Sequence, residues 1–144
     1  MSLEAVQEKI FKTPERLMSA AGVLALGIGS FFVYYFDPSK AGFFPGCPLL
    51  NLTGFACPGC GLTRGFHEFF HGHFLAALDY NALVPIYAVV FAFLAVLFTS
   101  IAVRGRDLKF TIFSPTTLTI FLIISGTFGV LRNIPADPFR VLFP

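Results

Sequence analysis

Residues 82–103 read ALVPIYAVVFAFLAVLFTSIAV, a run of twenty-two residues without a charge. At a rise of about 1.5 Å per residue, a helix of this length crosses a hydrocarbon core of about 30 Å. Pro85 falls in the first turn, where a missing backbone N–H costs least. The run therefore predicts a membrane-spanning helix and decides the fold class.

Two further apolar segments flank this run. Residues 17–36 form an uncharged stretch of twenty residues, and Thr13-Pro14-Glu15 before it is typical of a helix start. Residues 115–131 are apolar with several hydroxyls, and Ser114-Pro115 supplies a cap and a first-turn proline. We expect an all-α integral membrane protein, a single domain over residues 1–144 with spans near 17–36, 82–103 and 115–131.

The composition agrees with this class. The chain has 144 residues, of which 56% are hydrophobic and 12% charged, and this excludes an ordinary soluble domain. A formal net charge of +2 is too small to favour nucleic acid as a partner. The lipid bilayer is the expected partner, and residues 1–16 have the spacing of a short amphipathic helix or form a solvated tail.

The segment 37–81 separates the first two spans. Its first part, residues 37–61, is rich in Pro, Gly and Cys and predicts tight turns. Residues 62–80 then show a helical pattern, with a break or bend at Gly72. If that helix began at Cys60, Arg64, His67 and His71 would follow along one stripe of its surface. The alternative is an amphipathic helix that turns its polar side to water.

Charge predicts the orientation of these segments. With three crossings, residues 1–16 and 104–114 share one side and carry six Lys and Arg, whereas the other side carries four. Basic loops favour the cytoplasmic side. We therefore expect a multi-pass protein of a bacterial cytoplasmic membrane, with the cysteine loop outside the cytoplasm in an oxidising compartment.

The residues Cys57-Pro-Gly-Cys-Gly-Leu-Thr-Arg64 now carry a resemblance. Together with Cys47-Pro48, His71-Gly72, Asn81 and Arg132-Asn133-Ile-Pro135, they resemble a family of small prokaryotic membrane proteins of unknown function with a CPxCGxTR signature. The resemblance implies a three-helix topology and the motif residues Cys57, Cys60, Gly61, Arg64 and Asn81. It implies no reaction. His73 stands where the family pattern has an acid.

A metal site is one interpretation of the cysteines. Cys57-Pro-Gly-Cys60-Gly resembles the knuckles of rubredoxins and zinc ribbons, in which backbone amides point at two thiolates. Cys47 and one of His67 or His71 would complete a tetrahedral set for zinc or iron. Against it, the spacing of these residues matches no established zinc finger.

Two other interpretations use the same sulfur atoms. Cys57 and Cys60 at a helix start, with Arg64 one turn on, would favour a reactive thiolate and a membrane thiol-disulfide oxidoreductase. Alternatively, a disulfide among Cys47, Cys57 and Cys60 would order a loop rich in glycine. The sequence leaves open whether the chain is an enzyme.

Four polar residues form a candidate binding set: Arg64, Asn81, Arg132 and Asn133. The arginines would grip a lipid phosphate or an acidic partner, snorkel from helix ends, or pair with Asp79. Asn81 is a candidate helix cap. We interpret the chain as a small membrane accessory or scaffold protein that presents an ordered CPGCG loop to a membrane-protein partner or a second copy. Metal binding and thiol-disulfide exchange are the alternatives.

Overall fold

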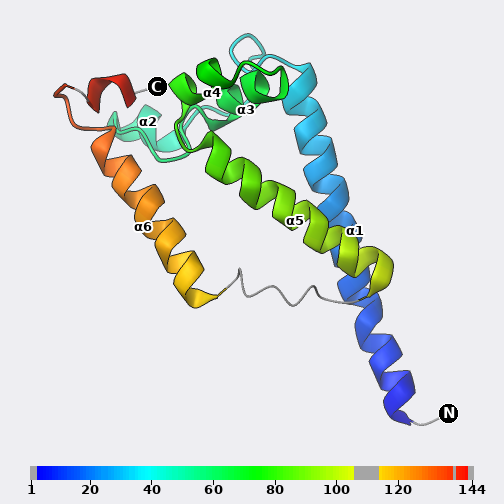
Figure 1. Ribbon diagram of the computed structural model, residues 1–144. Helices are drawn as coiled ribbons and strands as arrows, with labels where there is room; N and C mark the ends of the chain where they lie inside the picture. The colour runs from blue at the N-terminus through cyan, green and yellow to red at the C-terminus, as the bar shows by residue number, and fades with distance from the viewer. Residues whose placement is uncertain (1–2, 106–113, 138, 143–144) are drawn as a thin grey trace. The chain divides into compact units, whose positions relative to one another are not determined.

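The structure is a computed structural model that describes residues 3–105, 114–137 and 139–142, while the side chains of residues 3–13, 140 and 141 lie outside that description. The described part holds helices and no strand, which confirms the all-α class (Figure 1). The helices are α1 (Leu3–Tyr35), α2 (Pro48–Thr53), α3 (Leu62–Phe70), α4 (Phe74–Tyr80), α5 (Val84–Arg104), α6 (Pro115–Leu131) and the 3-10 helix η2 (Phe139–Leu142).

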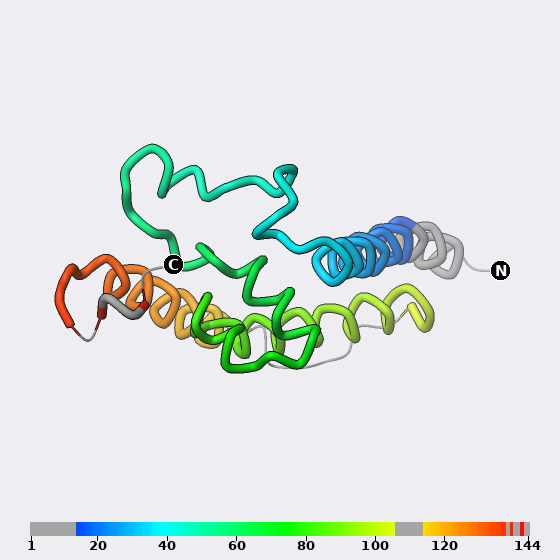
Figure 2. The backbone as a smooth tube through the Cα atoms, turned by 90° about the horizontal axis from the view of Figure 1, so that it is seen from above, coloured from blue at the N-terminus to red at the C-terminus, as the bar shows by residue number. Residues whose placement is uncertain are grey.

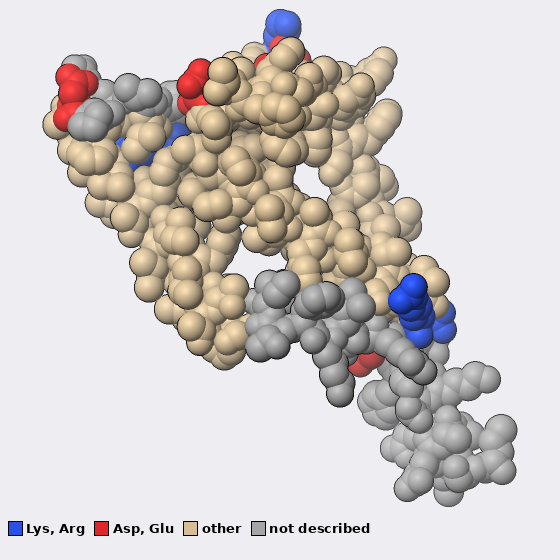
Figure 3. Space-filling model, in the orientation of Figure 1, with Lys and Arg blue, Asp and Glu red and all other residues tan. Residues whose placement is uncertain are grey.

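Two helices are long and apolar enough to cross a membrane. They are α1 from Pro14 to Tyr35 and α5 from Val84 to Arg104, whereas α6 is a shorter apolar helix of 17 residues. Surfaces of the described helices are largely free of Lys, Arg, Asp and Glu in Figure 3. Exposed apolar faces of this kind suit a lipid environment, and together with the two long apolar helices they indicate a membrane protein.

Helix α1 begins earlier than the sequence predicted. It runs from Leu3 through Pro14, so the interpretation of Thr13 as an N-cap is wrong. A proline inside a helix removes one backbone N–H, and α1 continues on both sides of Pro14 despite this loss. The predicted helix over residues 1–16 is present from Leu3, but its apolar side-chain pattern lies outside the described residues.

The chain divides into two compact units. Unit 1 comprises residues 1–31 and 88–110, and unit 2 comprises residues 32–87 and 111–144. In unit 1 the Arg16 guanidinium donates to the carbonyl oxygens of Ala102 and Val103, both at 3.1 Å, at the C-terminal end of α5. The side chain of Phe98 packs over Gly22, where a Cβ would lie 2.8 Å from the Phe98 ring.

Unit 2 contains the cysteine loop. The chain makes a long excursion between α1 and α3, and α2 lies within it (Figure 2). Turns were predicted over residues 37–61, so α2 is an addition to the prediction. It begins at Pro48 in a first-turn position and ends at Gly54, whose φ of 76° is the left-handed conformation that glycine adopts most readily.

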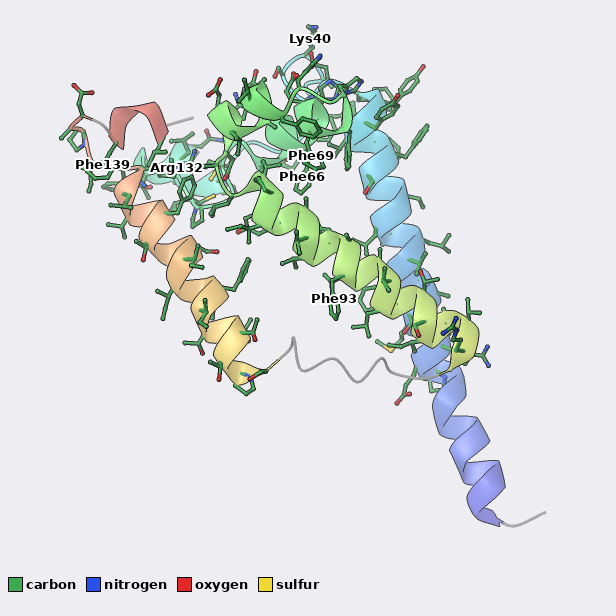
Figure 4. The ribbon with its side chains drawn as sticks, viewed as in Figure 1. Lys40, Phe66, Phe69, Phe93, Arg132 and Phe139 are labelled. Atoms are coloured by element: carbon green, nitrogen blue, oxygen red, sulfur yellow. The ribbon has the colours of Figure 1, made fainter. Side chains whose placement is uncertain are left out.

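Helices α3 and α4 pack against each other at the start of α5. The predicted break between them is confirmed at Gly72, which has a φ of 81°. Gly65 allows a close approach, since a Cβ there would lie 2.6 Å from Cγ2 of Val84 and 3.1 Å from the carbonyl oxygen of Ala77. Ala77 and Val84 are buried, and Phe66 and Phe69 of α3 make an edge contact (Figure 4).

Helix α6 begins as predicted. The Ser114 hydroxyl accepts a hydrogen bond from the Thr116 backbone N–H at 3.3 Å, and Pro115 occupies the first turn. Thr119 bonds its own helix backbone at Pro115, as expected for a hydroxyl in an apolar helix. The helix ends at Leu131, which places Arg132 and Asn133 beside the cysteine loop within unit 2.

Candidate metal centre

The three cysteines of the chain converge in unit 2. The Sγ atoms of Cys47, Cys57 and Cys60 all lie within 4.8 Å of one another. Cys57 Sγ is 3.2 Å from Cys47 Sγ and 3.4 Å from Cys60 Sγ, and all three cysteines are free thiols. Cys60 is buried, whereas Cys47 and Cys57 are half-buried. Residues that are up to thirteen positions apart in sequence therefore present one cluster of sulfur atoms.

A tight turn shapes the Cys57–Cys60 part of the cluster. The Cys60 backbone N–H donates to the Cys57 carbonyl at 3.0 Å, and the Leu62 N–H donates to the Gly59 carbonyl at 3.0 Å. The Cys57 N–H points at the Cys60 sulfur at 3.2 Å. An amide that donates to sulfur favours the thiolate form, as in metal knuckles. Gly61, with a φ of 79°, then turns the chain into α3.

Asn133 holds the start of this turn. Its Oδ1 accepts from the Ala56 backbone N–H at 2.7 Å, and its Nδ2 donates to the Ala56 carbonyl at 2.7 Å and to the Gly129 carbonyl at 2.6 Å. The side-chain amide of Asn133 therefore satisfies both the N–H and the carbonyl of Ala56, as a neighbouring β-strand would. Because Ala56 is buried, these bonds satisfy groups that water does not reach.

Asn81 holds the end of the turn and is buried, with an exposed fraction of 1%. Its Nδ2 donates to the carbonyl oxygens of Pro58 at 2.8 Å and Cys60 at 3.0 Å. Its Oδ1 accepts from the Leu83 backbone N–H at 2.9 Å, just before α5 begins. The bond to Leu83 agrees with the cap expected from the sequence, and the other two bonds join the cysteine turn to α5.

Arg132 lies under the same turn and is also 1% exposed (Figure 4). Its Nη1 donates to the carbonyl oxygens of Cys57 at 3.0 Å and Cys60 at 3.1 Å, and its Nε donates to that of Leu142 at 3.2 Å. Its Nη2 is buried and has no hydrogen-bond partner among the described residues. The guanidinium also lies over the Phe128 ring, with Cζ 5.0 Å from the ring centroid.

The charges of the thiols and of Arg132 are linked. The neighbouring Cys60 thiol, then the Leu50 backbone N–H, lower the pKa of Cys47 to about 6. Burial raises the pKa of Cys60, and the other two thiols add to that rise. Thiols this close lose their protons one after another rather than together. Burial lowers the pKa of Arg132, while negative charge on the three cysteines opposes that shift.

The predicted stripe from Cys60 to His71 does not form. Helix α3 begins at Leu62, so the left-handed Gly61 interrupts the helical spacing before it reaches Cys60. Cys60 turns into the sulfur cluster, and Arg64 lies over the Tyr80 ring with Cζ 5.3 Å from the centroid. His67 and His71 do contact each other, with ring centroids 4.4 Å apart.

Two other expectations for the polar residues are wrong. Arg132 does not snorkel to water, because it is buried against the carbonyls of the cysteine turn. Asp79 is exposed and, within the described part of the chain, pairs with neither Arg64 nor Arg132. The histidines also lie apart from the sulfur atoms. Among the described residues, the group of side chains close enough to hold one metal ion consists of Cys47, Cys57 and Cys60, and it includes neither His67 nor His71.

Comparison with protein families adds one finding. Residues 47–95 match the model of DUF2752, described as a protein of unknown function. The DUF2752 match begins at Cys47 and includes Cys57, Cys60 and Asn81, which agrees with the expected family of unknown function. Arg132 and Asn133 lie beyond it. No curated protein and no solved structure matches the chain.

The sequence did not reveal how Arg132 and Asn133 act. The sequence made both residues candidates for binding a ligand, whereas in the structure both donate hydrogen bonds to the backbone of the cysteine turn. A signal was present, since a charged residue and an amide that directly follow an apolar helix need partners close to the membrane. Gly129 was missed as well. A Cβ there would lie 2.8 Å from Cγ of Pro58, so glycine allows α6 to approach the turn.

Proposed function

We propose that this chain is a membrane protein that binds a thiophilic metal ion, zinc or iron, through Cys47, Cys57 and Cys60. The observation that carries the proposal is the convergence of all three sulfur atoms within 4.8 Å of one another. The backbone of the Cys57–Cys60 turn is held by three buried or part-buried polar side chains, those of Asn81, Arg132 and Asn133. Such support is typical of a site whose ligands must keep a fixed geometry.

The spacing of the sulfur atoms suits one ion. With Zn–S bonds of about 2.3 Å, the edge of a tetrahedral site is about 3.8 Å. The Cys47–Cys57 contact of 3.2 Å and the Cys57–Cys60 contact of 3.4 Å are slightly shorter than this edge, so these two pairs need to separate by about 0.5 Å, while the Cys47–Cys60 pair lies within 4.8 Å. That adjustment lies within reach of side-chain rotation at the half-buried Cys47 and Cys57.

The charge of the site also favours a metal. Three thiolates and a divalent ion carry an excess of one negative charge, and the buried guanidinium of Arg132 supplies one positive charge. A buried arginine without a carboxylate partner is costly unless another negative group lies near it. The negative charge of the cysteines favours the charged form of Arg132, so the thiolates can serve as the negative group that this buried guanidinium requires.

Three cysteine ligands leave a fourth position open. Neither His67 nor His71 belongs to the sulfur group, so water or a ligand from another molecule would complete a tetrahedral set. We propose that the site serves a membrane assembly as an accessory component, with a membrane-protein partner or a second copy at the open position. The half-buried Cys47 and Cys57 give such a partner access.

We further propose three spans in a bacterial cytoplasmic membrane, with the cysteine loop on the extracytoplasmic side. Support comes from the apolar 17-residue α6 and from the excess of Lys and Arg in segments 1–16 and 104–114. The orientation can be tested with single cysteines introduced at Ser39 or at Ser2 in a chain without its native cysteines. Each variant is labelled in intact cells with an impermeant maleimide. Reaction at residue 2 alone would overturn it.

The metal proposal is tested on the full chain purified in detergent under reducing conditions. We expect a stoichiometric amount of zinc or iron by mass spectrometry, protection of all three thiols from alkylation, and thiolate-to-metal absorption after cobalt replacement. Cys47→Ser, Cys57→Ser and Cys60→Ser should each reduce the bound metal, and His73→Asn is the matched control that should retain it. A metal-free protein with three reactive thiols after growth with both metals would refute the proposal.

Thiol-disulfide exchange is the second candidate. The sequence assigned it to Cys57 and Cys60, but burial raises the pKa of Cys60, whereas Cys47 combines a lowered pKa with the Cys57 sulfur at 3.2 Å, so we propose the Cys47–Cys57 pair. The Cys47 thiolate would attack a substrate disulfide and displace one substrate thiolate. Cys57 would then displace the second, leaving a Cys47–Cys57 disulfide and a reduced substrate dithiol. A dithiol reductant would return the protein to its starting state.

The pH dependence of alkylation tests this second candidate in the metal-free protein. Since the pKa of Cys47 is lowered to about 6, its thiolate predominates above that pH and is lost as the pH falls through it. We expect the alkylation rate of Cys47 to rise to half its maximum near pH 6. A midpoint at the ordinary thiol pKa, with no Cys47–Cys57 disulfide after exposure to a disulfide substrate, would eliminate the exchange reaction.

A further inference from the structure

His67 and His71 form a second cluster of ligand atoms that the sulfur site does not use. They stand four residues apart at the end of α3, so their side chains lie one above the other. Their ring centroids are 4.4 Å apart, with an angle of 43° between the ring planes. A centroid distance of 4.4 Å is compatible with the separation of about 3 Å between two nitrogen ligands of one ion.

The hydrogen bonds of the two rings decide which nitrogen is available. His67 Nδ1 lies 2.7 Å from the Val33 carbonyl oxygen, and His71 Nδ1 lies 2.8 Å from the His67 carbonyl oxygen. A carbonyl accepts but cannot donate, so each Nδ1 carries the proton. In the neutral rings the lone pair is therefore on Nε2 of both residues, which is the form that binds a metal.

Neighbouring groups hold the rings in place. Tyr34 stacks on His71, with centroids 4.8 Å apart and planes 7° apart. The carbonyl of Val33 anchors His67 to the end of α1, within unit 2. These contacts reduce the rotamer freedom that a metal ion would otherwise have to remove from the two side chains.

The local charge permits a cation at this place. Arg64, the basic side chain nearest along α3, interacts with the Tyr80 ring. The Asp37 carboxylate pairs with Lys40, whose Nζ lies 3.0 Å from Oδ2, and its pKa is lowered by the Ser39 backbone N–H, then by Lys40, and to a smaller extent by the charge of His67. Because Lys40 and Asp37 neutralise each other, this ion pair adds no net positive charge that would repel a cation from the two imidazoles.

We propose that His67 and His71 bind a divalent transition-metal ion, such as Ni²⁺, Cu²⁺ or Zn²⁺, through their Nε2 atoms. The remaining coordination positions are filled by water. Imidazole suits these ions, and carbonyl-bound Nδ1–H groups are the usual outer partners of metal-binding histidines. The site shares no ligand with the three cysteines, so it stands or falls independently of the sulfur site.

A site-resolved experiment can use the unaltered full chain. All three histidines of the chain, His67, His71 and His73, can be followed by their imidazole resonances in detergent micelles. His73 is the internal control because its Nδ1 pairs with the Glu68 carboxylate at 2.7 Å. During a titration with Ni²⁺, we expect paramagnetic broadening of His67 and His71 at concentrations that leave His73 sharp. Equal broadening of all three, or broadening of His73 first, would overturn the proposal.

Asparagine variants supply the second measurement. Asparagine places its Nδ2 near the position of histidine Nδ1, so His67→Asn can keep the bond to Val33 while it removes Nε2. We expect His67→Asn and His71→Asn each to weaken Ni²⁺ binding by about tenfold or more, or about 1.4 kcal/mol. His73→Asn should leave the affinity unchanged. Ni²⁺ binding that survives the double variant His67→Asn/His71→Asn would refute the site.

Discussion

The helix pair of unit 1 and the cysteine turn of unit 2 hold their backbones in different ways. In unit 1, α1 and α5 contact through apolar groups such as Gly22 and Phe98, and Arg16 adds hydrogen bonds at one end. In unit 2, Asn81, Arg132 and Asn133 donate to the backbone carbonyls of residues 56–58 and 60. A helix satisfies its own backbone, whereas a turn beside a membrane needs side chains for this purpose.

This difference predicts which substitutions the two regions tolerate. Removing a side-chain donor from the turn removes hydrogen bonds to its carbonyls, and a bond from a charged donor such as Arg132 is worth about 1.5–3 kcal/mol. A methyl group added at Gly22 in the helix pair would require only that the Phe98 side chain move. The largest effects are therefore expected in the turn and the smallest in the helix pair.

Arg132→Leu should have the largest effect. The substitution removes three hydrogen bonds to carbonyls and the positive charge beside the thiols, so we expect a loss of about 3 kcal/mol or more in the free energy of unfolding. Denaturant titration in detergent, followed by thiol alkylation, measures this loss. Cys60, which is buried, should become reactive at lower denaturant concentration.

Arg64→Leu is the matched control for Arg132→Leu. Arg64 contributes a cation–π contact with Tyr80, which is worth about 0.5–1 kcal/mol at a partly exposed site. If the two variants lost the same stability, the carbonyl contacts of Arg132 would have no special importance. Arg132→Lys should also be destabilised, because a single ammonium group cannot reproduce the spread of guanidinium donors.

Asn133→Asp should cost about 2 kcal/mol at neutral pH. The new oxygen would face the carbonyl oxygens of Ala56 and Gly129, both at less than 3 Å from Nδ2 in the native residue. Facing carbonyls disfavour the carboxylate and raise its pKa, so the loss should shrink as the pH falls and the protonated carboxyl can donate again. Asn51→Asp, on an exposed residue of α2, is the control and should shift stability by less than about 0.5 kcal/mol at any of these pH values.

Gly129→Ala should have an intermediate effect. A Cβ at this position would lie 2.8 Å from Cγ and 3.1 Å from Cδ of Pro58, and the overlap should cost about 1–3 kcal/mol, reduced by the better helix propensity of alanine. Thermal unfolding in micelles measures the result. Gly126→Ala in the same helix meets nothing within 4 Å and should be neutral or slightly stabilising. A stable Gly129→Ala would show that α6 can move away from the turn.

The sequence predicted the features that depend on local pattern. The break at Gly72 and the Ser114 cap follow from residue types at fixed offsets, and the apolar runs follow from length alone. The predicted cysteine grouping also rested on composition, because three cysteines in one short loop have few ways to avoid one another. These signals need no knowledge of the tertiary structure.

The features that the sequence missed depend on contacts between distant residues. Arg132 bonds to Cys57, seventy-five positions away, and no periodicity connects the two. The stripe through Cys60 failed because one left-handed glycine, Gly61, broke the helical spacing on which it relied. Pro14 gave the opposite error, since the helix continued through a residue that usually marks a start. Arg132 thus depends on a tertiary contact that no pattern encodes, whereas Gly61 and Pro14 adopt conformations that their residue types permit but do not dictate.

Gly22→Ala should have the smallest effect, although its geometry matches that of Gly129. The new Cβ would also approach its neighbour to 2.8 Å, here the Cδ2 atom of Phe98. Phe98 is only half-buried and its ring can rotate about two bonds, whereas Pro58 has a closed ring in a turn that Asn81 fixes through the Pro58 carbonyl. We expect a change of at most about 1 kcal/mol, measured against Gly27→Ala, which meets nothing within 4 Å. If Gly22→Ala were as damaging as Gly129→Ala, the distance alone would set the penalty. The polar contacts around the turn would then contribute nothing to its rigidity.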